Sequence, residues 1–258
     1  MGTTTAVYAL YTRRLRRRLR DAELPRHIGL IMDGNRRWAR KAGLANPSLG
    51  HKAGAEHVDD VLAWCESLGI GHVTVFVCST ENLERRSEAE VAFLMDLITR
   101  VVSERLARPG TRWQLHVAGD LSGLPDRTAH ALKDAVDATG DCATGQHVTL
   151  AIGYGGRQEV VDALRELLTE RAESGRTLTE VADELRTDDI ARHLYTAGHP
   201  DPDLVIRTSG EQRMSNFLLW QSAYSELYFC DAHWPAFREV DFLRALRSYA
   251  VRERRHGR

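Results

Sequence analysis

Long hydrophobic runs are missing from this 258-residue sequence. No window approaches the 18 consecutive apolar residues that indicate a membrane-spanning helix, so we expect none. The N-terminus also lacks the order of a secretory signal, because its basic cluster follows a short apolar stretch instead of preceding it. Disordered, collagen-like and coiled-coil chains are excluded too, since 43% of the residues are hydrophobic and no low-complexity tract occurs.

Cysteine and net charge are also scarce. The four cysteines are widely spaced and form no C-x-x-C pair. This spacing predicts free thiols in a reducing cytoplasm, and neither a disulfide framework nor a cysteine zinc site. The 35 basic and 36 acidic residues give a net charge of −1. Because nucleic-acid-binding proteins usually carry a basic domain, we expect no nucleic-acid partner.

The basic residues gather at the N-terminus. Residues 1–26 carry seven arginines against two acidic residues, a net charge of +5. Most of these arginines flank Leu15 and Leu19, whose i,i+4 spacing predicts a short basic helix. Such a helix either packs on the domain, which is the interpretation we favour, or makes a peripheral contact with an anionic membrane surface. We therefore expect a basic N-terminal helix or arm over residues 1–23 and a single domain over residues 24–258.

Apolar runs and helical periods alternate from residue 27 onward. Short apolar runs predict strands at residues 27–32, 72–78, 113–118, 147–152 and 204–206. Helical spacing of apolar residues predicts helices at residues 51–68, 91–102, 126–138, 159–173 and 241–254. Strands that alternate with helices of this length are typical of βαβ units, so the sequence predicts an α/β fold with a mostly parallel sheet.

Polar segments that contain glycine, serine, asparagine or arginine follow four of the predicted strands. They are residues 33–38, 79–82, 153–157 and 207–216. In an open parallel sheet, ligands bind beyond the carboxyl ends of the strands. We therefore expect these segments to lie together and to form the functional site.

The residue types in these segments suit phosphorylated ligands. Gly34 allows close approach of the backbone to a ligand. Forked donors that fit phosphate come from Arg37, Arg207 and Arg213. Asp33 would repel a phosphate unless a cation bridged the two, so it predicts a hard metal ion, namely Mg²⁺. Neither a G-x-x-x-x-G-K-[ST] loop nor a G-x-G-x-x-G fingerprint is present, so these nucleotide motifs do not explain the site.

The motif blocks of the sequence are MDGNRRWAR (32–40), GHKAGA (50–55), STENLERR (79–86), GYGGR (153–157), DLVIRTSGEQRMSNFLLWQSAYSELYF (203–229) and WPAF (234–237). In this order they closely resemble the cis-prenyltransferases, the undecaprenyl diphosphate synthase family, and most of all its short-chain Z-farnesyl diphosphate synthase branch. The resemblance implies the butterfly fold, a six-stranded, mainly parallel sheet surrounded by helices, with a hydrophobic tunnel and a homodimeric assembly. It also implies condensation of isopentenyl diphosphate with an allylic diphosphate to form a cis double bond.

The resemblance implies roles for individual residues. Asp33 matches the essential aspartate that holds Mg²⁺ on the allylic diphosphate, and Asn82 matches a catalytic position implicated in proton removal or substrate placement. Glu226 matches a metal-associated glutamate at the dimer contact, and residues 255–257 resemble an R-x-G tail that reaches the partner's site. The residues that match substrate-binding positions are Gly34, Asn35, Arg36, Arg37, Trp38, His51, Ser79, Thr80, Glu81, Arg85, Arg207, Arg213 and Ser215.

Departures from the family pattern bear on chain length. Leu83 stands where long-chain members often have tryptophan, and Val77 where they often have alanine. A larger Val77 in the tunnel wall would shorten the space for the product, so we expect a C15 chain. Other residues expected to line the apolar pocket are Val91, Phe93, Leu94, Leu97, Ile98 and Val101.

A further departure affects one diphosphate contact. Asn46 and Pro47 stand where many family members have a diphosphate-binding arginine. Arg40 and Lys41 are the candidates to replace that contact.

Three other functions were weighed against the short-chain synthase. A long-chain decaprenyl or undecaprenyl diphosphate synthase and a head-to-middle condensing or cyclising synthase both remain open, because the same phosphate-binding groups serve all of these reactions. A non-catalytic partner subunit is disfavoured, because such partners lose the aspartate that matches Asp33 and much of the block that contains Asn82.

Overall fold

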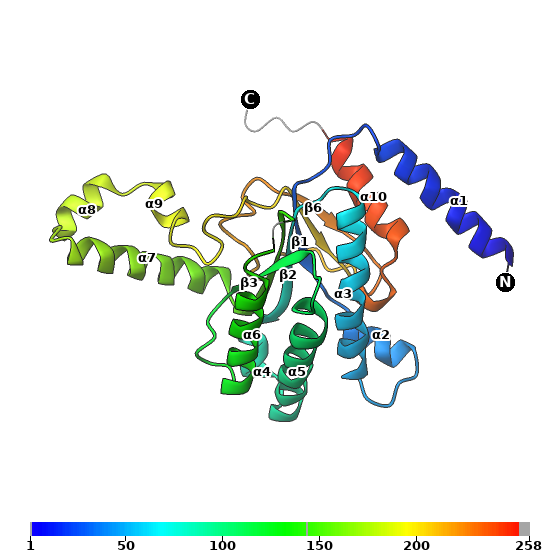
Figure 1. The fold of residues 1–258 in the computed structure, drawn as a ribbon, viewed down its shortest axis with the longest axis horizontal. Coiled ribbons are helices and arrows are strands. Elements are labelled where there is room, and N and C mark those ends of the chain that lie inside the picture. The colour runs from blue at the N-terminus through cyan, green and yellow to red at the C-terminus, as the bar shows by residue number, and fades with distance from the viewer. Residues whose placement is uncertain (1, 143, 253–258) are drawn as a thin grey trace.

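A single six-stranded sheet forms the centre of the computed structural model, which describes residues 2–142 and 144–252 (Figure 1). The strand order is β3-β4-β2-β1-β5-β6, and every neighbouring pair is parallel. The strands are β1 (His27–Ile31), β2 (His72–Ser79), β3 (Trp113–Ala118), β4 (Gln146–Tyr154), β5 (Leu204–Arg207) and β6 (Glu226–Phe229). The predicted α/β fold with a mainly parallel sheet is confirmed.

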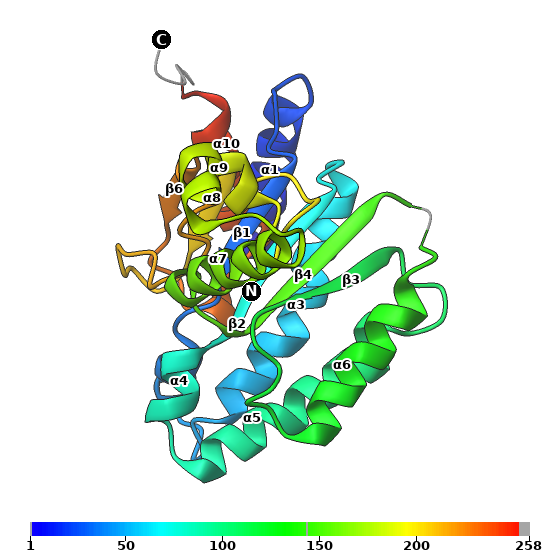
Figure 2. The ribbon, with the colours of Figure 1, turned by 90° about the vertical axis from the view of Figure 1, so that its left-hand side faces the viewer.

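Two groups of helices differ in how they lie relative to the sheet. Three of them, α3, α5 and α6, lie side by side against one face (Figure 2), whereas α7, α8 and α9 form an arm that projects away from the sheet (Figure 1). The helices are α1 (Gly2–Leu19), α2 (Asn35–Lys41), α3 (Leu49–Ser67), α4 (Thr80–Arg85), α5 (Glu88–Val101), α6 (Asp126–Thr139), α7 (Gly156–Glu173), α8 (Leu178–Glu184), α9 (Thr187–Ala191) and α10 (Glu239–Ala250). A π-helical turn over Val102–Leu106 extends α5.

The two faces of the sheet bury different cores. Leu30 and Leu150 belong to the large core beneath α3, α5 and α6, whereas the adjacent Ile31 and Ala151 belong to a smaller cluster on the second face. Successive side chains of a strand point to opposite faces, so both sets must be apolar if both faces are covered. This requirement explains the nearly continuous apolar runs of the central strands.

The basic N-terminal segment forms α1, which packs against α10. Leu15 and Leu19 are buried, and the Nε of Arg16 lies 2.5 Å from a carboxylate oxygen of Glu239 on α10. The arginine Arg244 of α10 lies over the ring of Tyr11 at 5.3 Å. Within residues 2–142 and 144–252, no helix is both long enough and apolar enough to cross a membrane.

The sequence pattern missed several short elements. Its five strands are all present with ends shifted by up to two residues, but β6 (Glu226–Phe229) was expected only through the family resemblance. The helices α8 and α9 were not predicted at all, because each is shorter than two turns of clear apolar spacing. The last helix runs from Glu239 to Ala250, earlier than predicted, because Asp241 and Arg238 cap its start.

Candidate active site

Asp33 lies directly after β1 and faces two arginines. Its Oδ2 accepts a hydrogen bond from Nη2 of Arg207 at 2.9 Å, and its Oδ1 accepts one from Nη2 of Arg37 at 3.1 Å. Burial disfavours the ionised carboxylate, but the hydrogen bonds and charges of Arg207 and Arg37 outweigh this effect and lower the pKa of Asp33. Asp33 is therefore an anion at neutral pH.

Arg207 is a buried cation at the end of β5, with only 4% of its surface exposed. Its Nη1 donates to the main-chain oxygen of Arg213 at 2.5 Å and to Oγ of Ser215 at 2.6 Å. Its buried Nε has no hydrogen-bond partner among residues 2–142 and 144–252. A buried N–H group without a partner is rare and costs stability.

The loop that follows β5 has an unusual backbone. Ser209, Ser215, Asn216 and Leu218 all have positive φ angles, of 76°, 50°, 65° and 44°. Residues other than glycine seldom adopt this conformation, and it persists where the surrounding structure fixes the chain, often at functional sites. Here Leu218 and the neighbouring Phe217 are fully buried on the second face of the sheet and anchor the loop.

Asn216 joins three of the polar segments that follow the strands. Its Nδ2 donates to Oε1 of Glu81 at 3.0 Å, its Oδ1 accepts from the main-chain N–H of Arg157 at 2.9 Å, and its main-chain oxygen accepts from the N–H of Gly156 at 2.8 Å. The structure thus brings together the segments after β2, β4 and β5, as the parallel sheet predicts.

A cavity of about 960 Å³ opens among these segments. Its polar lining contains thirteen of the residues that the sequence predicts as site residues. They are Asp33, Gly34, Asn35, Arg36, Arg37, His51, Ser79, Glu81, Asn82, Arg85, Arg207, Arg213 and Ser215.

The remaining predicted site residues lie elsewhere. Trp38 on α2 and Thr80 at the start of α4 do not line the cavity. Glu226 is ion-paired with Arg252. It stands opposite Leu204, the first residue of β5, and Leu204 lies three residues, or about 10 Å along the strand, before Arg207. The predicted roles of these three residues stay predictions, and the R-x-G tail at residues 255–257 lies outside the described residues.

A histidine and a carboxylate organise one side of the cavity mouth. His51 Nε2 lies 3.7 Å from Oε1 of Glu90, which also contacts Arg36 and Arg86. Burial lowers the pKa of His51 to about 4, aided by the charge of Arg86 and opposed by Glu90. His51 is therefore neutral at pH 7 and able to donate or accept a hydrogen bond without adding charge.

Sequence reasoning missed several polar residues of the cavity. Arg86, Arg157, Glu211 and Asn216 all line it, as does Arg40, which was named only as a replacement contact. Glu211 accepts hydrogen bonds from Arg37 at 3.5 Å and from Arg213 at 2.5 Å, and so holds the two arginines together. Arg157, Glu211 and Asn216 lie in the polar segments that follow β4 and β5, so membership of such a segment is the signal that could have found them.

The inner part of the cavity is apolar. It reaches between the sheet and helices α3 and α5, where Leu94, Leu97, Ile98 and Val101 confirm four of the six lining residues predicted on α5. Val91 and Phe93 do not line the cavity. Phe93 is one residue before Leu94, and successive helical residues point about 100° apart, so its side chain points away from the lining side of α5. The partly buried Val91 packs against the large core. The other apolar lining residues include Val58, Val75, Val77, Val102, Leu106 and Leu150.

Two lining residues come from the π-helical turn that ends α5. Val102 and Leu106 are 1% and 5% exposed and lie at the end of the wall furthest along the helix from Glu90 at the mouth. π-Helical turns are rare in proteins, and those that occur are often found at functional sites. From Leu94 to Val101 the α-helical part of the wall extends about 10 Å, taking 1.5 Å of rise per residue.

Fold and cavity together define a class: an α/β protein whose carboxylate- and arginine-lined mouth leads into an apolar interior. Residues 31–257 match the family described as "Putative undecaprenyl diphosphate synthase". The chain belongs to the undecaprenyl diphosphate synthase family and is a prenyltransferase.

Named relatives cover nearly the whole chain. An isoprenyl transferase of Streptomyces fradiae is 70% identical over 100% of both chains. A short-chain Z-isoprenyl diphosphate synthase of Mycobacterium bovis is 51% identical, and a (2Z,6E)-farnesyl diphosphate synthase of Mycobacterium tuberculosis is 50% identical, each over 98% of this chain and 96% of its own.

A solved structure has the same fold. It is that of lavandulyl diphosphate synthase from Lavandula x intermedia in complex with dimethylallyl diphosphate. The TM-score is 0.84 and the identity 34%, over 91% of this chain and 99% of that one.

Proposed function

We propose that the protein is a short-chain cis-prenyl diphosphate synthase. It joins isopentenyl diphosphate to geranyl or dimethylallyl diphosphate and releases a short Z-prenyl diphosphate, with Z-farnesyl diphosphate as the expected product. The observation that carries this proposal is that one cavity holds both the polar cluster around Asp33 and Arg207 and an apolar wall. The similarity to the mycobacterial short-chain Z-isoprenyl and (2Z,6E)-farnesyl diphosphate synthases supports the short chain. The dimethylallyl diphosphate bound to lavandulyl diphosphate synthase supports an allylic substrate.

The reaction requires charge at one end of the cavity and dryness at the other. The allylic C–O bond breaks, and the diphosphate leaves with the electron pair, held by the guanidinium group of Arg37. The double bond of isopentenyl diphosphate then attacks the allylic cation, and loss of one proton creates the new cis double bond. The apolar wall keeps water from capturing the cation. Ser79 and Asn82, which line the cavity beside α4, are proposed to orient this second step.

Mg²⁺ is proposed to bind at Asp33. An ionised carboxylate offers about four lone-pair sites. Among the described residues, the Asp33 carboxylate accepts two hydrogen bonds, both from arginines, so sites remain for a metal ion. Mg²⁺ binds through one or two carboxylates together with substrate phosphates, so the donor set fits the ion. When bound, Mg²⁺ supplies positive charge that neutralises the leaving diphosphate.

The metal proposal is tested with Asp33→Ala. Turnover should fall by orders of magnitude while the circular dichroism spectrum is retained, and EDTA should abolish the activity of the unmodified chain. Asp96→Ala, which removes an exposed carboxylate from α5, is the matched control and should keep full activity. Near-normal turnover of Asp33→Ala, or in EDTA, would remove the metal from the mechanism.

Product analysis tests the function itself. The chain is incubated with isopentenyl diphosphate and with dimethylallyl, geranyl or farnesyl diphosphate in turn, and the products are separated by chain length. We expect C15 products from the shorter starters. C50–C55 products would identify a long-chain synthase, and branched C10 diphosphates would identify a head-to-middle synthase.

A homodimer is also proposed. Tyr224, two residues before the Glu226 that the family resemblance places at the dimer contact, is 85% exposed, and Leu219 is 39% exposed. Large apolar side chains exposed together are typical of protein interfaces. Light scattering at micromolar concentration should give twice the chain mass; a fully active monomer would contradict the proposal.

The cell location is a further proposal, based on the exposed arginines of α1. We place the protein in the cytoplasm, with a peripheral membrane contact through the exposed arginines of α1. These are Arg13, Arg14, Arg17 and Arg18. Sedimentation with anionic vesicles, compared with neutral vesicles, measures that contact.

A further inference from the structure

A row of histidines crosses the second face of the sheet, at the end opposite the cavity. His27 and His72 begin β1 and β2 and stand opposite each other, and His72 stands opposite His147 near the start of β4. His116 of β3 lies two residues beyond Gln114, which is the register partner of His147. Alternation along the strands places all four side chains on the same face as the small core.

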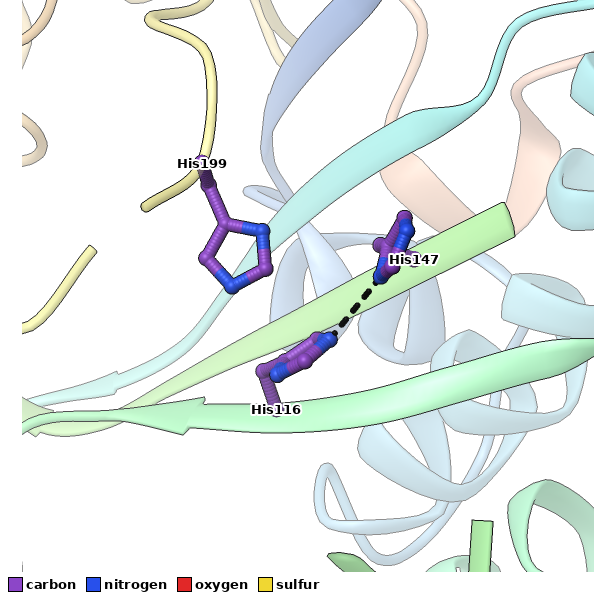
Figure 3. A group of neighbouring side chains, drawn as sticks. All are labelled: His116, His147 and His199. Atoms are coloured by element: carbon purple, nitrogen blue, oxygen red, sulfur yellow. Dashed lines mark hydrogen bonds between the residues drawn. The ribbon is translucent and has the colours of Figure 1, made fainter. Parts of the chain in front are cut away.

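Three imidazoles converge at one end of this row. His116, His147 and His199 come from β3, from β4 and from the segment between α9 and β5, and their rings gather around one point (Figure 3). One nitrogen of each lies within 4.8 Å of the others. Nε2 of His116 and Nδ1 of His147 are 3.1 Å apart.

These separations suit a shared metal ion. Two nitrogen ligands bound to a tetrahedral metal at 2.0–2.1 Å are about 3.3 Å apart. The pair His116–His147 already has nearly this spacing. His199 lies on a connecting segment with a nitrogen within 4.8 Å of both, so it is the ligand that must move closer to complete the set. All three side chains are partly exposed, which leaves a path for an ion from solvent.

The other two histidines of the row support the cluster from behind. His27 is fully engaged, with Nδ1 2.6 Å from the oxygen of Pro200 and Nε2 2.8 Å from Oγ1 of Thr74. His72 stacks on His147 with ring centroids 4.7 Å apart and an interplanar angle of 10°. The stacking fixes the ring plane of His147, as groups around a metal ligand commonly do.

We propose that His116, His147 and His199 bind one divalent transition-metal ion of the zinc class, with water as the fourth ligand. Imidazole is a ligand for zinc, copper and nickel, whereas Mg²⁺ prefers oxygen, so this site and Asp33 select different ions. The bound ion ties the segment between α9 and β5 to β3 and β4. Its role is structural, far from the diphosphate end of the strands.

The test is calorimetric titration of the untagged chain with Zn²⁺ in the presence of excess Mg²⁺, which occupies the oxygen sites. We expect one Zn²⁺ per chain and a rise in Tm on binding, because an ion that binds only the folded state stabilises it. His199→Ala and His116→Gln should each weaken Zn²⁺ binding by at least about 10- to 100-fold. His130→Ala, which removes an exposed histidine from α6, is the matched control and should bind as the unmodified chain does.

Two further outcomes decide the proposal. Asp33→Ala should keep its Zn²⁺ affinity, which separates this site from the catalytic mouth. His199→Ala changes a connecting segment and not a strand, so it keeps the test valid if His116→Gln does not fold. The proposal is overturned if the unmodified chain binds no Zn²⁺ at micromolar concentration, or if His199→Ala binds it with unchanged affinity and the same rise in Tm.

Discussion

Two arginines at the cavity mouth are held in different ways. Arg37 contacts Asp33, and its Nη2 also donates to Oγ of Ser209 at 2.6 Å. Arg213 contacts Glu211 and keeps 63% of its side chain exposed. Arg37 is therefore tied to the carboxylate proposed to act on the allylic substrate, whereas Arg213, although paired with Glu211, is exposed enough to meet a second diphosphate.

Kinetics should separate these two arginines. Arg37→Ala should mainly raise KM for the allylic diphosphate, and Arg213→Ala should mainly raise KM for isopentenyl diphosphate. Loss of a charge-assisted contact costs roughly 1.5–3 kcal/mol, or about 10- to 150-fold in affinity. Arg127→Ala, whose side chain is 81% exposed on α6, serves as control. If both variants raise KM for the same substrate alone, the assignment of the two sites is wrong.

His27 makes the stability depend on pH. It is 3% exposed, and burial lowers its pKa to about 4 from a usual value near 6.5. Between these two values the unfolded chain binds a proton that the folded chain does not, so the stabilising contribution is complete above pH 6.5 and is lost as the pH falls toward 4. At 1.36 kcal/mol per pKa unit, the loss is about 3 kcal/mol.

Urea unfolding at pH 7.5 and at pH 4.5, with EDTA present, measures the total loss, to which His51 and His116 also contribute because burial lowers the pKa of each to about 4. His27→Gln should lose less free energy of unfolding over the same pH interval, because glutamine does not titrate. His130→Ala should behave as the unmodified chain. Equal losses in His27→Gln and the unmodified chain would show that His27 is not the titrating group.

At the scale of elements, Glu159 connects α7 to its surroundings. This carboxylate has no exposed surface and accepts hydrogen bonds from the hydroxyl of Tyr154, the side-chain amide of Gln221 and the main-chain N–H of Tyr195. Burial raises its pKa, although these three hydrogen bonds oppose the shift. Glu159 thus joins α7, the end of β4, the segment after α9 and the loop after β5.

Removing Glu159 should loosen all of these elements. Glu159→Ala leaves buried donors without an acceptor, at 1–3 kcal/mol each, so we expect the free energy of unfolding to fall by about 3 kcal/mol or more. Glu159→Gln keeps one acceptor oxygen and should cost less. Glu166→Ala, on the exposed side of the same helix, should change the stability by less than about 0.5 kcal/mol. Chemical denaturation measures all three, and equal effects at Glu159 and Glu166 would contradict the connecting role.

Elements differed in how far the sequence could predict them. The strand His72–Ser79 was found because its apolar, β-branched residues are continuous, as burial on both faces requires. The strand Glu226–Phe229 was not found by pattern, because it is an edge strand of four half-buried residues without a distinct alternation. The π-helical turn after α5 has no local sequence signal, since packing around the cavity decides it.

For the whole molecule, the site was predictable in outline and not in detail. Strand ends of a parallel sheet share one edge, so the grouping of Asp33, Ser79 and Arg207 followed from their positions after β1, β2 and β5. Which partners they have did not follow. The hydrogen bonds of Asn216 depend on positive φ angles, for which the sequence has no signal. The sequence pattern does not distinguish Glu211 from a solvent-exposed carboxylate, but the fold places it between Arg37 and Arg213.

The length of the product is a property of the whole cavity, because the sheet, α3, α5 and the π-helical turn all contribute to its wall. Each added isoprene unit needs further apolar space, and overfilling a packed wall typically costs 1–3 kcal/mol. Val77→Ala combined with Leu94→Ala should therefore shift the products from C15 toward C20 and longer, with the starter still consumed.

Val161→Ala, at an exposed position of α7, is the control for that experiment. Leu94 is 5% exposed, and its truncation can cost 2–5 kcal/mol of stability, so Val77→Ala alone is the milder variant that keeps the test valid if the double variant unfolds. Products are compared by chain length at equal conversion. An unchanged C15 product from a folded double variant would mean that the limit lies deeper, at Leu106 and Leu150, and Leu106→Ala would then be the substitution that lengthens the chain.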